Sequence, residues 1–200
     1  METLKTRKAE LRSIMRAALS DIGREQRAEW DAKIEERITE SSLLREAEWV
    51  YAYAPLSWEP GTQGFLERIL TEGKRLALPR TGPKDGDMSF EWVRSISELK
   101  KGRFGILEPE AKAEPLSAPV PGERITVLTP GLGFAPDGRR LGKGGGYYDR
   151  FFAARPGITS VGIAYECQIR DDIPEGADDM RVAWIVTPER IIQAGLWCRP

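Results

Sequence analysis

The segment from Pro130 to Asp149, PGLGFAPDGRRLGKGGGYYD, contains the residue types that bind phosphate. It holds seven glycines, the cations Arg139, Arg140 and Lys143, two adjacent tyrosines and an aspartate. Glycines let backbone amides approach phosphate oxygens because no Cβ intervenes, and arginine and lysine neutralise phosphate charge. The segment therefore predicts a loop that binds a triphosphate.

Two familiar nucleotide-binding patterns do not fit this loop. The Gly142-Lys143 pair has no glycine five positions earlier and no serine or threonine after it, both of which a Walker A loop needs. The pattern GxGxxG fails because Tyr147 or Tyr148 stands where it requires glycine. Since no loop hydroxyl is available for magnesium, which usually takes one or two carboxylates together with phosphates, Asp149 is the candidate metal ligand.

The amino-acid composition excludes several classes of reaction and of binding partner. Of 200 residues, 40% are hydrophobic and 30% charged, which is typical of a globular domain and not of a disordered chain. The chain has no histidine, which excludes Ser-His-Asp catalysis and HExxH zinc sites. Thirty basic and 31 acidic residues give a net charge of -1, so the molecule as a whole is not attracted to nucleic acid or to an acidic membrane.

Cysteine usage and the N-terminal sequence predict the compartment. The two cysteines, Cys167 and Cys198, form no CxxC pair, so a reducing environment is expected. Residues 1–19 are charged throughout, and no segment approaches the ~20 apolar residues that cross a bilayer. We therefore expect a cytoplasmic protein that neither enters a membrane nor binds nucleic acid.

Alternating helical and strand patterns must position the loop. Apolar residues at helical spacing predict helices over 5–19 and 26–40, and a helix that begins at Thr62 and stops at Gly73. β-prone runs predict strands at 49–53, 76–78, 88–93, 125–129, 160–164 and 182–187. A strand, a helix and a strand within about thirty residues indicate a βαβ unit and a parallel sheet.

We predict one α/β domain over residues 1–200, with three layers: a mostly parallel central sheet flanked by helices and preceded by N-terminal helices. The glycine-rich loop follows the strand at 125–129 and leads into a helix at 147–154. Open α/β sheets bind ligands beyond the carboxyl ends of their strands, so this loop lies where a ligand is expected. We expect 97–100 to be a turn and 130–146 to be irregular.

The loop resembles the hallmark segment of the 5-formyltetrahydrofolate cyclo-ligases, also called methenyltetrahydrofolate synthetases. The matching residues are Pro-Gly-Leu-Gly-Phe at 130–134, Gly138, Arg140-Leu141-Gly142, Gly144 and Gly146-Tyr147-Tyr148-Asp149. Weaker similarities extend over most of the chain: Lys8-Ala9-Glu10-Leu11-Arg12, Gly105-Ile106-Leu107-Glu108-Pro109, and Asp179 before the last strand.

The resemblance implies an ATP-dependent cyclisation of 5-formyltetrahydrofolate to 5,10-methenyltetrahydrofolate, with release of ADP and phosphate. ATP and Mg²⁺ are the implied cofactors. Phosphoryl transfer depends on positioning and charge neutralisation, so a chain without histidine can perform it.

The resemblance, together with the loop's own composition, assigns roles to single residues. The catalytic residues are Arg140, Lys143 and Tyr147, and the magnesium ligands are Asp149 and Asp179. ATP is assigned to Lys8, Arg12, Arg139, Arg140, Leu141, Gly142, Lys143, Gly144, Gly145, Gly146 and Tyr147. The folate is assigned to Ala54, Glu59, Phe104 and Tyr147, with the Glu59 carboxylate accepting two hydrogen bonds from the amino-pyrimidinone edge of the pterin.

Plainer interpretations stay open. Without the resemblance, Lys8 and Arg12 are typical of a solvated helix face, Phe104 and Tyr148 of a core, and Asp179 of an acidic surface loop. Two other functions also stay open: a phosphotransferase acting on another formyl or acyl substrate, and a non-catalytic protein that binds ATP or folate. The sequence is compatible with a monomer or a homodimer.

Overall fold

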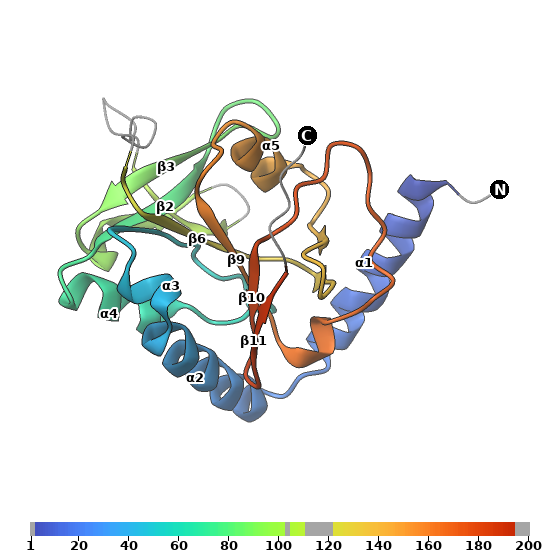
Figure 1. Cartoon of the computed structure of the whole chain (residues 1–200), viewed down its shortest axis with the longest axis horizontal. Coiled ribbons are helices and arrows are strands. Elements are labelled where there is room, and N and C mark those ends of the chain that lie inside the picture. Colours follow the sequence, from blue (N-terminus) through green and yellow to red (C-terminus); the bar gives the residue numbers. More distant parts are fainter. Residues whose placement is uncertain (1–2, 103–104, 111–121, 195–200) are drawn as a thin grey trace.

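The structure, a computed structural model, describes residues 3–102, 105–110 and 122–194. Seven strands within these ranges form one sheet in the order β11-β10-β9-β6-β1-β2-β3 (Figure 1). The five inner strands run parallel, whereas β3 and β11 at the two edges are antiparallel to their neighbours. The sheet strands are β1 (Trp49–Tyr51), β2 (Arg75–Thr81), β3 (Met88–Val93), β6 (Ile125–Thr129), β9 (Thr159–Ile163), β10 (Trp184–Val186) and β11 (Ile191–Gln193).

Helices cover both faces of the sheet, which gives the three predicted layers (Figure 1). The helices α1 (Leu4–Ser20), α2 (Arg24–Glu40), α3 (Ser42–Arg45) and α4 (Gln63–Thr71) contribute to one core, and α5 (Tyr147–Ala153) contributes to a second. Strand β1 shows why these two cores lie on opposite faces of the sheet. Val50 packs in the first core while Trp49 and Tyr51 pack in the second, because successive strand residues point to opposite faces.

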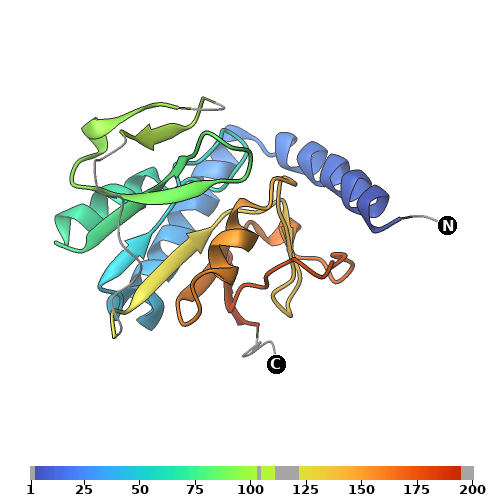
Figure 2. The same cartoon turned by 90° about the horizontal axis from the view of Figure 1, so that it is seen from above.

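Helix α1 extends outward from the body of the molecule (Figure 2). Leu11, Met15 and Leu19 bury its apolar face in the first core, at the helical spacing that the sequence predicts. The N-cap is Thr3, whose side chain accepts a hydrogen bond from the Thr6 amide at 3.2 Å.

The predicted fold class is confirmed. Strands β1 and β2 are parallel neighbours and α4 connects them, so the βαβ unit is present. Gly73 follows α4 with a φ of +74°, in the left-handed region that glycine adopts readily at a helix end. Predicted and observed strand ends differ by up to three residues: β2 is longer than 76–78, and β10 is shorter than 182–187.

Two expectations for irregular segments are wrong. The turn expected at 97–100 is a 3-10 helix, η1 (Ile96–Glu98), followed by β4 (Leu99–Lys101), which pairs with β5 (Leu107–Pro109). The segment 130–146 contains the hairpin of β7 (Gly133–Phe134) and β8 (Arg140–Leu141). Strands of two or three residues are too short to show a hydrophobic period, so pattern reasoning misses them, as it misses α3, β11 and the 3-10 helix η3 (Glu166–Gln168).

Across the described ranges, no helix combines the length and apolar character that crossing a membrane requires.

Candidate active site

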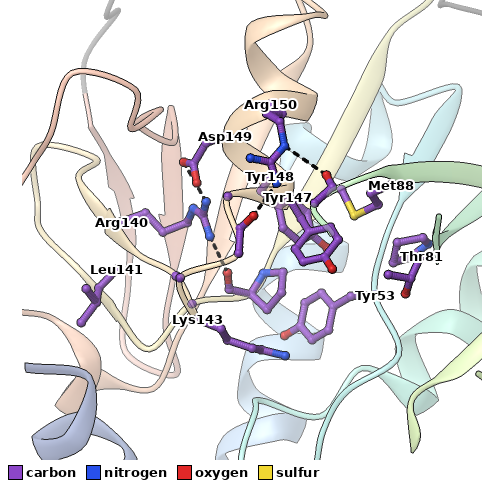
Figure 3. A pocket seen from close by; sticks show the side chains of 18 of the residues that line it. Tyr53, Thr81, Met88, Arg140, Leu141, Lys143, Tyr147, Tyr148, Asp149 and Arg150 are labelled. Carbon is purple, nitrogen blue, oxygen red and sulfur yellow. Dashed lines mark hydrogen bonds and ion pairs between the residues drawn. The ribbon is translucent and has the colours of Figure 1, made fainter. Parts of the chain in front are cut away.

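A cavity of about 930 Å³ opens at the carboxyl ends of β1, β2 and β6 (Figure 3). Tyr53 and Ala54 follow β1, Thr81 ends β2, and Pro130 follows β6. This is the sheet edge at which α/β folds bind ligands. The predicted site residues that line the cavity are Lys8, Arg12, Ala54, Glu59, Arg140, Leu141, Gly142, Lys143, Gly144, Gly145, Gly146, Tyr147, Asp149 and Asp179.

The predicted ATP ligand Arg139 does not reach the cavity. Its guanidinium donates to the Asp137 carboxylate at 2.9 Å, to the Asp171 carbonyl at 3.0 Å and to the Ile173 carbonyl. Neighbouring residues of the β7–β8 hairpin point to opposite sides, so Arg140 lines the cavity and Arg139 holds the 171–173 segment. Phe104, predicted to contact the folate, lies outside the described residues.

The glycine-rich loop is held in place by two arginines from different helices. Arg12 on α1 donates from Nε to the Gly142 carbonyl at 2.9 Å. Arg150 on α5 donates from Nη2 to the Gly145 carbonyl and from Nε to the Gly86 carbonyl, the latter at 3.1 Å. Gly144 has a φ of +106°, which an L side chain rarely adopts, so this turn of the loop requires glycine.

Arg140 forms a buried ion pair at the cavity wall. Its side chain is 4% exposed, and Nη2 donates to Asp149 Oδ1 at 3.0 Å (Figure 3). Asp149 Oδ1 also accepts from the Met180 amide at 3.1 Å. Within the described ranges, Arg140 Nε is buried and has no hydrogen-bond acceptor. Because a buried donor without a partner is costly, this atom is suited to an anionic ligand.

Lys8 and Arg12 lie on one face of α1, and both line the cavity. Lys8 forms an ion pair with Asp179, whose Oδ2 also accepts from the Gly176 amide. Burial lowers the pKa of the Arg12 guanidinium, and the neighbouring cation Arg16 lowers it further. Arginine starts from such a high pKa that Arg12 stays charged, so the cavity holds several cations near the loop.

Glu59 lies opposite the glycine-rich loop. Its Oε2 accepts a hydrogen bond from the Leu56 amide at 2.9 Å, and its Oε1 lies 2.9 Å from Lys143 Nζ. Burial, and next the charge of Glu59, raise the pKa values of Tyr53 and Tyr148, so both phenols are neutral at pH 7. Glu59 is therefore a buried carboxylate close to two neutral phenols and to the ammonium of Lys143.

Contacts outside the cavity hold the Glu59 loop. Asp31 on α2 accepts from the Gly61 amide at 2.8 Å and from the Tyr165 hydroxyl at 2.7 Å. Thr62 Oγ1 donates to the Tyr53 carbonyl at 2.7 Å, and the Tyr53 hydroxyl donates to the Pro60 carbonyl at 3.1 Å. These bonds fix the loop on both sides of Glu59.

Sequence reasoning missed part of the cavity. Arg150, Gly86, Thr81 and Glu108 line it but received no role, and the Thr81 hydroxyl donates to Glu108. A signal for one of them was available, because Arg150 lies four residues after Gly146 and so shares its side of the helix start. No sequence signal indicated that the β2–β3 turn at Gly86 would touch that arginine.

The donor set fits magnesium bound largely by phosphate. Within the parts of the chain that the structure describes, no three His, Cys, Asp or Glu side chains form a cluster that could hold a metal ion. Asp149 lines the cavity with Oδ1 occupied by Arg140 and Met180, while its Oδ2 has no hydrogen bond to any described residue. Magnesium needs only one or two carboxylates when phosphates supply other ligands, so Asp149 suffices as an anchor.

The family model of the 5-formyltetrahydrofolate cyclo-ligase family matches residues 4–188. The chain is 29% identical over 197 residues to a probable 5-formyltetrahydrofolate cyclo-ligase of Caenorhabditis elegans, covering 93% of this chain and 95% of that protein. It is 32% identical over 153 residues to the 5-formyltetrahydrofolate cyclo-ligase of Escherichia coli K12, covering 72% and 80% of the two chains.

Solved structures have the same fold. The 5,10-methenyltetrahydrofolate synthetase of Aquifex aeolicus superposes with a TM-score of 0.79 at 28% identity, covering 96% of each chain. The corresponding protein of Mycoplasma pneumoniae superposes with a TM-score of 0.71 at 21% identity, covering 90% of this chain and 98% of that one.

Proposed function

The chain belongs to the 5-formyltetrahydrofolate cyclo-ligase family, and on that basis we propose that it uses ATP and Mg²⁺ to convert 5-formyltetrahydrofolate into 5,10-methenyltetrahydrofolate. The observation that carries the proposal is one cavity with two chemically different sides. The glycine-rich loop and most of the cations line one side, and the buried carboxylate of Glu59 lines the other, where the ammonium of Lys143 meets it at 2.9 Å.

The cationic side is assigned to the phosphates of ATP. Lys8, Arg12 and Arg140 line the cavity together with the loop 142–146, which contains Lys143. Arg140 Nε is a buried donor without an acceptor among the described residues. Charge-assisted hydrogen bonds from such groups are shorter and stronger than neutral ones. Positioning and charge neutralisation make up most of the catalysis of phosphoryl transfer, and these residues can supply both.

The opposite side is assigned to the pterin. Glu59 is held by the Leu56 amide and by its loop, and Ala54 also lines the cavity. A carboxylate can accept two hydrogen bonds from an amino-pyrimidinone edge, which fixes the orientation of the ring. Tyr147, which lines the cavity from the start of α5, is assigned to the boundary between the two ligands.

When bound, ATP supplies the phosphoryl group that turns the formyl oxygen into a leaving group. The formyl oxygen would form a bond to the γ-phosphorus as the bond from that phosphorus to the bridging oxygen breaks and ADP leaves. N10 would then form a bond to the formyl carbon and lose its proton, and the bond between that carbon and the formyl oxygen would break, so that phosphate departs with the oxygen. The chain's contribution is to place N10 and the formyl group near the phosphate-binding cations and to exclude water.

Magnesium is assigned to Asp149, with Asp179 as a second ligand. Asp179 Oδ2 is paired with Lys8, so coordination of a metal through that oxygen requires Lys8 to move to a phosphate oxygen.

We also propose that residues 1–200 form one domain and that the enzyme is cytoplasmic; the free thiol of Cys167 suits a reducing compartment.

The test follows product formation. Purified protein is mixed with 5-formyltetrahydrofolate, ATP and magnesium, and methenyltetrahydrofolate is followed by its ultraviolet absorbance while each component is omitted in turn. Product that forms only in the full mixture supports the proposal. Phosphate release from ATP with a different formyl or acyl compound, and none with formylfolate, would favour the phosphotransferase alternative, whereas ligand binding without turnover would favour a binding protein.

A further inference from the structure

Lys143, which the proposed function assigns to phosphate, is paired in the structure with Glu59, which it assigns to the pterin. The distance between Lys143 Nζ and Glu59 Oε1 is 2.9 Å. The Glu59 side chain is 2% exposed and the Lys143 side chain 39% exposed. The carboxylate is therefore held by its surroundings, whereas the ammonium has room to change its position.

The two oxygens of Glu59 differ in their surroundings. Oε2 already accepts from the Leu56 amide, while Oε1 makes no hydrogen bond of good geometry to any described residue. Oε1 is therefore the oxygen with capacity to accept from a pterin. Lys143 is the cation that lies against it, so the pterin and Lys143 compete for the same atom.

Lys143 also belongs to the loop assigned to phosphate. Gly142 and Gly144 flank it, and its side chain runs from the glycine-rich loop toward the side of the cavity where Tyr53 lies (Figure 3). Its ammonium is 5.1 Å from the centre of the Trp58 ring, within the range of a cation–π contact. A lysine side chain has rotatable bonds along its length, so rotation can move the ammonium from Glu59 to the loop without moving the backbone.

We propose that Lys143 exchanges partners when ligands bind: it pairs with Glu59 in the nucleotide-free protein and with the terminal phosphate of ATP in the complex. This inference rests on the proposed function. ATP draws the ammonium away and uncovers Oε1 for the pterin, and the pterin occupies Oε1 and releases the ammonium for phosphate. The two ligands then strengthen each other's binding by the same factor, because coupling between two sites is reciprocal.

The expected strength of the coupling between nucleotide and folate binding follows from the exchange of one ion pair. Couplings between sites are typically about 5–150-fold. A pair in which one member is more than a third exposed is screened by solvent, so we expect about tenfold, near the lower end of that range.

The first experiment measures the dissociation constant of 5-formyltetrahydrofolate calorimetrically, with and without a saturating non-hydrolysable ATP analogue and magnesium. For the wild-type protein, the analogue should tighten folate binding about tenfold. Lys143→Met should bind folate with nearly equal affinity in both conditions, since no ammonium covers Glu59. The control is Lys84→Met, which removes an exposed lysine outside the cavity wall and should keep the wild-type ratio.

The second experiment uses the nucleotide analogue alone. Glu59→Gln removes the charge that holds Lys143, so the analogue should bind this variant several-fold more tightly than wild type. If Glu59 had only a structural role, Glu59→Gln would not increase the affinity for the analogue. The analogue should also change tryptophan emission in the wild-type protein by moving the ammonium from Trp58, and this change should be absent in Trp58→Phe and in Lys143→Met.

The outcomes separate this inference from the proposed function. If wild type turns over formylfolate but the analogue does not alter folate affinity, or if Lys143→Met keeps the wild-type ratio, the exchange is refuted and the function stands. If wild type binds no folate in either condition, the proposed function fails and the exchange fails with it.

Discussion

Arg140 Nη2 donates to Asp149 Oδ1 across 3.0 Å, and the Met180 amide donates to the same oxygen. This one oxygen atom joins the glycine-rich loop, helix α5 and the segment that carries Asp179. A group assigned to phosphate and a group assigned to magnesium are thus held in a fixed relationship to each other, while Arg140 Nε and Asp149 Oδ2 have no hydrogen-bond partners among the described residues.

Asp149→Asn should weaken the magnesium dependence of turnover. The amide oxygen can still accept from Arg140 and Met180, so the fold should be retained, but the negative charge offered to the metal is lost. We expect the magnesium concentration for half-maximal rate to rise about tenfold or more, in line with the loss of one hard oxygen ligand. A magnesium titration of initial rates measures this. Asp178→Asn, at an exposed neighbouring acid, is the control, and equal titration curves for the two variants would remove Asp149 from the metal site.

Arg140→Met should damage both catalysis and stability. Loss of a positioned donor to developing charge typically lowers the rate by about 10²–10³-fold. Removal of one partner from a buried ion pair typically costs about 3–5 kcal/mol, here reduced because the Met180 amide still binds Asp149. Turnover and urea unfolding measure the two effects. Arg140→Lys keeps the charge and should recover stability more than rate; a variant with normal kcat/KM would contradict the assignment.

Asp31→Ala should raise the KM for folate although Asp31 does not line the cavity. It removes the acceptor for the Gly61 amide and the Tyr165 hydroxyl, which loosens the loop that presents Glu59. We expect a loss of about 1–3 kcal/mol in unfolding free energy, because a part-buried donor is left unpaired. The KM for ATP should stay near its wild-type value. Glu36→Ala, at an exposed position of the same helix, is the control, and a parallel rise in both KM values would indicate general loosening instead.

Gly86→Ala should disrupt the contact between the β2–β3 turn and the glycine-rich loop. A Cβ at this residue would overlap the guanidinium of Arg150, and the backbone has a φ of +89°. Gly157→Ala is a matched control, since Gly157 has a φ of +91° and open space around it. Both variants should lose about 1–2 kcal/mol from the backbone conformation. Only Gly86→Ala should also raise the KM for ATP, and combining it with Arg150→Met should add little further loss.

Unfolding free energy should fall as the pH rises above about 10, the pKa of an unfolded tyrosine. Burial raises the folded-state pKa values of Tyr53, Tyr148 and Tyr165, so their neutral forms stabilise the fold fully below that pH and the contribution is lost above it. Tyr148→Phe should reduce the slope by up to about 1.4 kcal/mol per pH unit. It should cost little at pH 7, because Tyr148 Oη has no hydrogen-bond partner among the described residues. Urea unfolding of wild type and Tyr148→Phe from pH 7 to 11 measures the cost at pH 7 and the slope, and equal slopes for the two proteins would contradict this prediction.

The sequence predicted the elements whose signal is local. Four of the five residues in the run Ile125–Thr129 are β-branched, and the run forms β6 with the predicted bounds. The composition of the glycine-rich loop also predicted a ligand site, and Arg140, Lys143 and Asp149 all line the cavity. Their individual roles remain predictions.

The contacts between distant segments could not be predicted. Lys143 and Glu59 were assigned to different ligands, and no pattern indicated that they would meet. Arg139 and Arg140 are identical in type and adjacent in sequence, so only the β7–β8 hairpin decides which of them faces the cavity. Such outcomes depend on tertiary placement, which local periodicity does not encode.

The ion pair between Lys8 and Asp179 and the hydrogen bond from Arg12 to Gly142 join early and late parts of the chain in one cavity. A ribosome delivers these residues in order, so a growing chain has no complete cavity until Asp179 has emerged. Local helices can form earlier during synthesis, but the contacts that join α1 to the later segments form only at this late step. The order of synthesis therefore makes completion of the cavity one of the last events in the folding of the chain.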